Sequence, residues 1–446
     1  MPTEPSRLAD ILRRPATWHY ASLAICLAFL LYLGSTQWFF YDEWAFLIPQ
    51  PVGGLFAPHV GHWSTSPILI TQALRAVFGL STYLPYVGLL IVVHLTLAHL
   101  LWRLMNRVGV AGWLATSLAA LFMLLGAGAE NLLWAFQIGF VGAMALGVAV
   151  VLILDRPDLG RGATIAVIAL SVWSLTFSGT AVPVLIAGGL VSLARRGMLR
   201  TLALLGPSAV VYAVWYLTVQ LPSGSGSRFA VSSLDELMVD SPRFFGHFFV
   251  DGLGAVLPFP FMGAIAVFAL LVWALRTVPA WRGPATAAYA LAGAAIIQGV
   301  LVSVSRVQLG TESASAGRYV YALVALLLPA IGLAFGWFAR GRATIVIVLS
   351  ALTVLVLVYN VGLLVRDTQS QVARETETQA QVYAALDIVT APGADFPADA
   401  QPMPDFAPDL TVGDLIAMYD AGWITRGAYP AETADGIREA LENWTP

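Results

Sequence analysis

Lysine is missing from this sequence, and other polar side chains are scarce. All 23 basic residues are arginine, and charged residues make up only 11% of the 446, against about 25% in an ordinary soluble domain. Hydrophobic residues account for 58% of the chain, and the mean hydropathy is +0.78. So few polar side chains could not cover the surface of a soluble protein of this length. The composition therefore excludes a soluble enzyme and a disordered chain.

Cysteine is almost as rare, and several catalytic signatures are absent. Cys26 is the single cysteine, so no intramolecular disulfide can form and a secreted disulfide scaffold is excluded. The sequence contains no Walker A motif, no Gly-x-Ser-x-Gly and no His-Glu-x-x-His, which argues against ATP-driven steps and against two common hydrolase classes. A net charge of −3 gives no indication of a nucleic-acid partner.

Long apolar runs are what the chain has in abundance. A run of about 20 apolar residues can cross a bilayer as a helix, and such runs recur along most of the sequence. We therefore predict an all-α polytopic membrane protein with about 11 transmembrane helices. The predicted spans lie near residues 18–38, 83–105, 110–125, 132–154, 163–177, 181–194, 201–220, 257–275, 285–304, 319–338 and 344–365.

The distribution of arginine predicts the orientation of these spans. Before residue 366, fourteen arginines fall in one set of alternate connections and five in the other. Because arginine is enriched in cytoplasmic loops, the N-terminus is predicted to be cytoplasmic and, after an odd number of spans, the C-terminal segment extracytoplasmic. The first run is too long for a signal peptide and is interpreted as an uncleaved anchor. Few ionisable residues lie within the spans, which argues against an ion-coupled transporter.

The chain divides into a membrane body and an acidic tail. Residues 1–365 form the body, with a long outer loop at 39–82, and residues 366–446 form a small C-terminal module with 14 acidic residues and four arginines. Thr411-x-x-Asp414 is typical of a capping box that opens a helix at 415–423, and 433–444 predicts a second short helix. In the outer loop, the short arginine-containing stretch 68–78 predicts an interfacial helix.

The most concentrated set of reactive side chains follows the first span. Asp42 and Glu43 are adjacent carboxylates at the predicted membrane boundary, and His59 and His62 follow in the same loop. Such carboxylates can take a proton from an acceptor hydroxyl, or bind a divalent cation together with the histidines. The alternative is a solvated helix end anchored by aromatic rings. His-x-x-His by itself is a weak metal signal, because no further ligand follows at zinc-site spacing.

Other outer residues also have two interpretations. Trp44 and Trp63 suit a sugar site as well as they suit membrane anchoring. Glu130, where the third span meets the fourth, is either a second acceptor-side or metal-side carboxylate or a helix-start charge favoured by the macrodipole.

Arginines on the outer side depart from the positive-inside pattern and therefore call for a specific partner. Arg306 and Arg318 flank one outer loop, and the planar guanidinium fork matches a phosphate. An ion pair with Glu312 or Asp251 is the alternative. Arg75, in the interfacial stretch, could bind phosphate in the same way.

Taken together, this arrangement resembles the GT-C superfamily of membrane glycosyltransferases, which use polyprenyl-phosphate-linked sugars. The resemblance covers most of the membrane body in its topology. The segment Ser64-Thr65-Ser66-Pro67 is similar to the arabinofuranosyl and mannosyl transferases of actinobacterial cell envelopes. The matching motifs are Asp42-Glu43 for the acidic motif after the first span, 68–78 for the interfacial helix, Glu130-Asn131 for a second acidic position and Gly317-Arg318-Tyr319 for the Arg-Tyr entry to a late span.

The resemblance implies a glycosyltransferase of the bacterial plasma membrane that serves cell-envelope or cell-wall biosynthesis. It would move a sugar from a polyprenyl-phosphate donor to an extracytoplasmic glycan, lipid or protein acceptor, without an obligatory metal, although Mg²⁺ or Mn²⁺ could bind. Asp42 would act as the base and Glu43 would hold the geometry. The donor phosphate would lie against Arg318, Arg306 or Arg75, and the acceptor or sugar near His59, His62, Trp44, Trp63, Glu130 and Tyr319. The alternative is a non-enzymatic translocase of lipid-linked sugars or a membrane scaffold, which would not explain the acidic pair.

Overall fold

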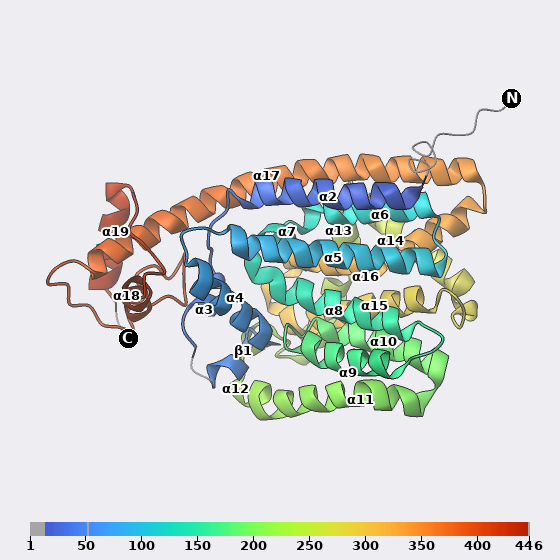
Figure 1. The fold of residues 1–446 in the computed structure, drawn as a ribbon, viewed down its shortest axis with the longest axis horizontal. Coiled ribbons are helices and arrows are strands. Elements are labelled where there is room, and N and C mark those ends of the chain that lie inside the picture. The colour runs from blue at the N-terminus through green and yellow to red at the C-terminus, as the bar shows by residue number, and fades with distance from the viewer. Residues whose placement is uncertain (1–13, 51–52, 445–446) are drawn as a thin grey trace.

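The protein is a bundle of helices from which one helix projects into a small separate module (Figure 1). The structure is a computed structural model and describes residues 14–50 and 53–444. Among these, the strands are confined to a short antiparallel hairpin, in which β1 (Pro58–His59) pairs with β2 (His62–Trp63). The predicted all-α architecture is confirmed.

Each of the eleven predicted spans coincides with a helix. Eight helices of the described residues are long and apolar enough to cross a bilayer. The other three, α6, α9 and α10, are shorter, so the count of eleven spans stays a prediction. The helices are α2 (Pro15–Gly34), α5 (Leu84–Val108), α6 (Gly112–Met123), α8 (Ile138–Leu154), α9 (Arg161–Leu175), α10 (Ala181–Arg196), α11 (Met198–Trp215), α14 (Met262–Thr277), α15 (Thr286–Arg306), α16 (Gly317–Ala339) and α17 (Ala343–Val389).

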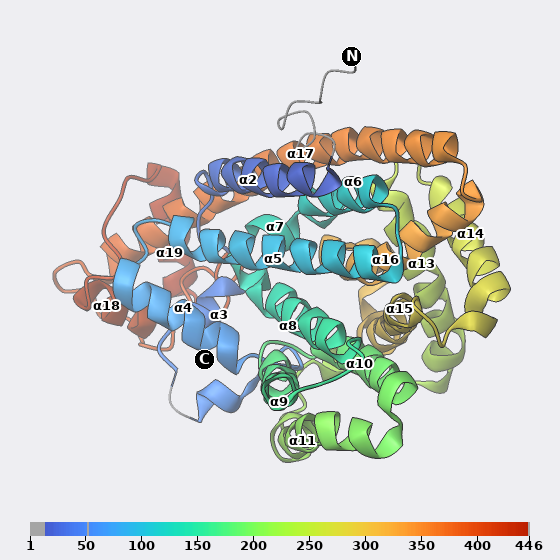
Figure 2. The ribbon, with the colours of Figure 1, turned by 45° about the vertical axis from the view of Figure 1, so that its right-hand side comes forward.

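Helix α8 lies at the centre of the bundle. Helices α2, α5 and α6 lie to one side of it, and α9, α10 and α11 to the other (Figure 2). Glycines of α8 allow its neighbours to approach closely, since Gly142 lies against the ring of Phe177 and Gly147 against Val184. Small residues at helix contacts are the usual means of tight packing inside a bilayer, where burial between helices has no hydrophobic driving force of its own.

Helix α17 joins the membrane body to the C-terminal module. It runs for 47 residues without a break, about 70 Å at 1.5 Å per residue, so the predicted boundary at 365/366 lies inside one continuous helix (Figure 1). The module contains α18 (Val412–Asp420) and α19 (Ala431–Glu442). Thr411 and Asp414 cap each other's backbone N–H groups at the start of α18, which confirms the predicted capping box.

Several short elements lie at the module end of the bundle. They include α3 (Glu43–Leu47), the hairpin and α4 (Thr65–Phe78), the helix expected at 68–78. Two more connect the third and fourth predicted spans, α7 (Glu130–Leu133) and the 3-10 turn η3 (Ala135–Gln137). All of the residues proposed below for the site come from this end.

No helix is predicted between the spans at 201–220 and 257–275, but one forms there. Helix α13 (Ser241–Val256) rests on the nearby ends of α15 and α16, where Phe245 and Phe249 flank Gly299, and Gly252 meets Leu323. The Asn360 side chain donates to the carbonyl of Val256 at 2.8 Å and ties α13 to α17.

The other elements are short turns between these helices. They are η1 (Gly54–Phe56), η2 (Gly126–Gly128), η4 (Tyr216–Gln220), α12 (Leu221–Ser223), η5 (Ser227–Phe229), η6 (Glu236–Asp240), η7 (Val278–Ala280), η8 (Val307–Leu309) and η9 (Thr311–Ser315).

Candidate active site

Glu43 is enclosed by protein and anchors the loop that follows α2. Its Oε1 accepts hydrogen bonds from the Tyr83 hydroxyl at 2.7 Å and from the backbone N–H of Phe136 at 3.2 Å. Its Oε2 accepts from the backbone N–H of Phe40 at 2.8 Å. Burial raises the pKa of Glu43 to about 8. This carboxyl group therefore joins three segments that are distant in sequence: the loop, the start of α5 and η3.

Asp42, the neighbouring residue, is only half-buried and makes no such set of bonds. It stands at the start of α3, directly after Tyr41, whose φ of +50° is unusual for a bulky side chain. The pKa of Asp42 is raised, mainly because the carboxyl group is partly buried. The nearby charge of Asp409 raises this pKa further, whereas His59 and Arg318 partly offset the increase. A carboxylate with a raised pKa is a stronger proton acceptor at neutral pH than an ordinary one.

The turn of the hairpin brings the two histidines to this end of the bundle in a strained conformation. Val60 and Gly61 have φ values of +46° and +85°, and a β-branched residue in this region is a real outlier. The turn is held from outside, since the Arg306 Nη2 donates to the carbonyl of Val60 at 3.0 Å and the N–H of Gly61 donates to the Ser225 hydroxyl at 3.1 Å. Strain of this kind often accompanies a functional site.

His59 lies between aromatic rings and next to two carboxylates. Its ring contacts those of Phe46 and Phe136 edge-on, and its buried Nε2 has no hydrogen-bond partner among the described residues. Burial lowers the pKa of His59, whereas Asp42 and Asp409 raise it. The ring is therefore placed to exchange a hydrogen bond with a group that enters beside Asp42.

His62 faces the break between α9 and α10, at Ser178 and Gly179. Its Nδ1 lies 3.4 Å from the Ser178 hydroxyl, and its ring packs edge-on against Phe140. Burial, followed by the charge of Arg306, lowers the pKa of His62 to about 3, so this imidazole is neutral at physiological pH.

Arg318 and Glu130 form an ion pair at the entrance to α16. The Arg318 Nη1 lies 3.3 Å from the Glu130 Oε2, and both side chains keep about a third of their surface exposed. The guanidinium also lies over the ring of Tyr319, 5.1 Å from its centre. Glu312 and Asp251 are the ion-pair partners that the sequence offers for the outer arginines, but the partner of Arg318 is Glu130.

The other two candidate arginines have different surroundings. Arg306 holds the hairpin turn, as described above. Arg75 is buried, donates to the carbonyl of Leu47 and lies beneath the ring of Trp423, 3.9 Å from its centre. Both of its contacts are therefore with the protein itself.

Trp44 and Trp63 are packed inside the protein. Trp44 is fully buried against Trp38 and Phe39. Trp63 stacks on Trp215 with ring centres 5.0 Å apart and donates to the Thr65 hydroxyl at 2.7 Å. These contacts hold the loop in place, and they leave neither ring exposed for stacking against a sugar.

The C-terminal module contributes a residue that sequence reasoning missed. Asp409 interacts electrostatically with Asp42 and His59, and burial raises its own pKa. The module is attached to the end of α4 in the bundle, where the N–H of Leu80 donates to the carbonyl of Trp423 at 2.7 Å. The only local signal was its position, two residues before the capping box.

Metal ligation has no assembled ligand set in this region. Within residues 14–50 and 53–444, no group of three or more His, Cys, Asp or Glu side chains is arranged to hold a metal ion. The ionisable groups gathered at the site are the half-buried carboxylate of Asp42, that of Asp409 from the module, the ion pair of Arg318 with Glu130, and two histidines.

Comparison with known proteins gives a likeness in structure but none in sequence. No family model and no curated protein matches the chain. The fold is similar to the crystal structure of ArnT from Cupriavidus metallidurans bound to undecaprenyl phosphate, with a TM-score of 0.52 and 15% identity. The match covers 95% of this chain and 88% of that one. The chain thus shares the polytopic, all-α fold of that protein.

Proposed function

We propose that this protein is a membrane glycosyltransferase that transfers a sugar from a polyprenyl-phosphate donor to an acceptor hydroxyl. The observation that carries the proposal is Asp42, a half-buried carboxylate of raised pKa beside Arg318. The site stands on a fold similar to that of a protein crystallised with undecaprenyl phosphate. A proton acceptor and a cation close together are what this transfer requires.

In the proposed reaction, Asp42 accepts the proton of the acceptor hydroxyl as its oxygen bonds to the anomeric carbon. The bond between that carbon and the phosphate oxygen breaks, and polyprenyl phosphate leaves with the bonding electrons. Arg318 stabilises the charge that develops on the phosphate. Proximity and orientation supply much of the rate, because phosphate is already a good leaving group.

The remaining residues divide between support and recognition. Glu43, Arg306, Arg75, Trp44 and Trp63 are proposed as positioning residues, since each is engaged by groups of the protein. The acceptor or sugar would be recognised by His59, His62, Tyr319 and Asp409, and Glu130 would orient Arg318.

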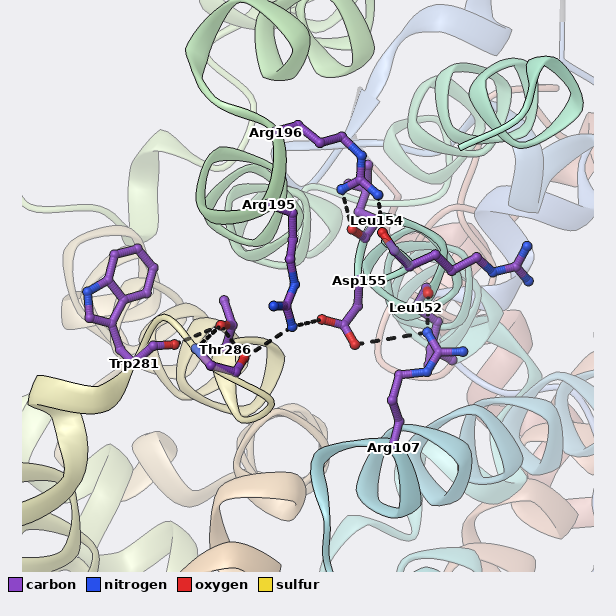
Figure 3. A network of polar contacts seen from close by, with 10 residues as sticks. Arg107, Leu152, Leu154, Asp155, Arg195, Arg196, Trp281 and Thr286 are labelled. Carbon is purple, nitrogen blue, oxygen red and sulfur yellow. Dashed lines mark hydrogen bonds and ion pairs between the residues drawn. The ribbon is translucent and has the colours of Figure 1, made fainter. Parts of the chain in front are cut away.

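The orientation and the substrate class belong to the same proposal. Arginines gather (Figure 3) where α5, α8 and α10 end, and these helix ends lie away from the module (Figure 1). This supports a cytoplasmic position for that end of the bundle in a bacterial plasma membrane. The site and the module would then be extracytoplasmic, where a glycan, glycolipid or protein acceptor is available. Residues 64–67, at the start of α4, resemble actinobacterial arabinofuranosyl and mannosyl transferases, so pentose and mannose donors are the first to test.

The test is transfer by the purified protein in liposomes that contain polyprenyl-phosphate-linked pentose or mannose and an envelope glycan acceptor. We expect product with the wild type and with Asp405→Asn, an exposed carboxylate of the module, and almost none with Asp42→Asn. Undiminished turnover by Asp42→Asn would refute the assignment of the base. Movement of the donor across the bilayer without any transfer would instead identify a translocase.

A further inference from the structure

A cluster of arginines surrounds one buried carboxylate (Figure 3), at the end of the bundle that lies away from the module (Figure 1). Asp155 follows the last residue of α8, and its carboxylate lies 2.9 Å from the Arg195 Nη2 and 4.0 Å from the Arg107 Nη1. Arg196 lies alongside and donates to the carbonyls of Leu154 and Arg156. The ends of three helices, α5, α8 and α10, thus meet around one charged centre.

Part of this cluster is explained by helix capping. Helices α5, α8 and α10 all end here, and cations near carbonyl ends of helices offset the macrodipole. Arg107 donates to the carbonyl of Leu152 at 2.6 Å, and Arg195 to that of Gly283 at 3.1 Å. Capping of α8 therefore accounts for the hydrogen bonds of Arg107 and Arg196, whereas Arg195 is held by Asp155 and by the connection before α15.

Capping does not account for Arg156 or for the space beside it. The Arg156 side chain is exposed and forms no ion pair with any residue that the structure describes. It faces an open cavity of about 520 Å³, and the residues lining the cavity are Arg107, Asp155, Arg156, Pro157, Arg195, Gly283 and Pro284. Three arginines against one carboxylate leave a surplus of positive charge around the cavity.

We propose that this cavity binds the phosphate of an anionic phospholipid headgroup. Arg107 and Arg195 each keep about 30% of their side-chain surface exposed, so donor groups remain free after the ion pairs are made. The cavity lies at the ends of apolar spans, the depth at which headgroups lie, and basic pockets between transmembrane helices bind anionic lipid in this way. A free phosphate ion could bind the same arginines, so the experiment has to distinguish a lipid phosphate from inorganic phosphate.

The experiment measures lipid retention and thermal stability of the whole protein. Protein in phosphatidylcholine nanodiscs is compared with protein in nanodiscs that contain graded fractions of phosphatidylglycerol, and bound lipid is counted by native mass spectrometry. We expect phosphatidylglycerol to be retained and to raise the unfolding temperature. Arg156→Gln should weaken retention about tenfold, since one charge-assisted hydrogen bond is lost, and Arg156→Glu should abolish it.

The matched control is Arg161→Gln, an exposed arginine at the same end of the bundle that does not line the cavity. It changes net charge equally and should leave retention unchanged. Equal losses in Arg156→Gln and Arg161→Gln would overturn the proposal, because they would reflect general surface charge. Inorganic phosphate could also stabilise the protein in pure phosphatidylcholine nanodiscs. If it did so as strongly as phosphatidylglycerol, and only when Arg156 is present, the proposal that the ligand is a lipid would be refuted. Neither readout depends on glycosyl transfer.

Discussion

Asp42 and Glu43 are neighbours in the chain, but the structure surrounds them differently. The sequence predicts an acidic pair at this boundary, yet it cannot say which carboxylate is available to a ligand. That distinction depends on Tyr83 and Phe136, which reach Glu43 from segments 40 and 93 residues away. Hydrogen bonds between distant segments leave no local pattern, so the choice of Asp42 as the base rested on the family resemblance and not on the residues of the loop.

The first prediction concerns the pH dependence of Glu43. Its pKa is raised to about 8 in the folded protein, so between about pH 5 and pH 8 the folded state holds a proton that the unfolded state has released. The free energy of unfolding should therefore fall as the pH rises through this range, by up to about 1.4 kcal/mol per pH unit from this group. Glu43→Gln should remove that slope.

The measurement is thermal unfolding of the wild type and of Glu43→Gln across this pH range. Subtracting the two free energies of unfolding removes the contributions of the other titrating groups. Glu432→Gln, an exposed acid at the start of α19, is the control and should keep the wild-type slope. Identical slopes in the wild type and Glu43→Gln would contradict the prediction.

The second prediction separates a phosphate ligand from a structural ion pair at Arg318. Arg318→Ala should raise the donor KM by about tenfold or more, because one charge-assisted bidentate contact contributes roughly 1.5–3 kcal/mol. Arg318→Lys should recover part of the loss, since lysine lacks the planar fork. Arg228→Ala should behave like the wild type, because that exposed side chain only covers the ring of Phe229.

Glu130→Gln supplies the decisive comparison for this pair. It breaks the same ion pair and leaves the guanidinium in place. A donor KM that rises equally in Arg318→Ala and Glu130→Gln would mean that Arg318 serves only as the partner of Glu130.

At the scale of elements, apolar runs and capping signals predicted most helices, because both are local. Thr411 and Asp414 lie three residues apart, and their mutual capping needs nothing from elsewhere in the chain. Helix α13 was not predicted, since its Phe245 and Phe249 find their partner, Gly299, in α15. The placement of the module could not be predicted either, because its docking rests on Trp423 and Leu80, 343 positions apart.

The third prediction concerns that docking. Trp423→Ala removes the ring that covers Arg75, a contact of about 0.5–2 kcal/mol, and the hydrophobic packing around it. We expect faster proteolysis within residues 390–444 and a higher acceptor KM, since the module brings Asp409 to the site. The donor KM should change little, because Arg318 belongs to the bundle.

The control for this variant is Trp281→Ala. Trp281 forms a similar contact with Arg282, 5.2 Å from its ring centre, and its packing lies outside the module. Equal effects of the two substitutions on acceptor KM, or an unchanged proteolysis rate in Trp423→Ala, would show that the Trp423 contact does not hold the module in place.

At the scale of the whole molecule, the fourth prediction is that transfer needs no divalent metal. In the proposed reaction, Arg318 neutralises the charge of the leaving phosphate and Asp42 accepts the proton, so neither step requires a metal ion. Protein treated extensively with EDTA should keep its transfer rate. Loss of activity that Mg²⁺ or Mn²⁺ restores would make Asp42 a metal ligand.

The path of the chain through the bundle also bears on how the protein is made. Asp409 comes after every predicted span in the order of synthesis, and it reaches Asp42 only when the module folds back onto the loop after α2. A growing chain can therefore insert its helices one after another before Asp409 is present at the site. Under the proposed function, a partly synthesised chain would therefore bind the acceptor weakly until the module has docked.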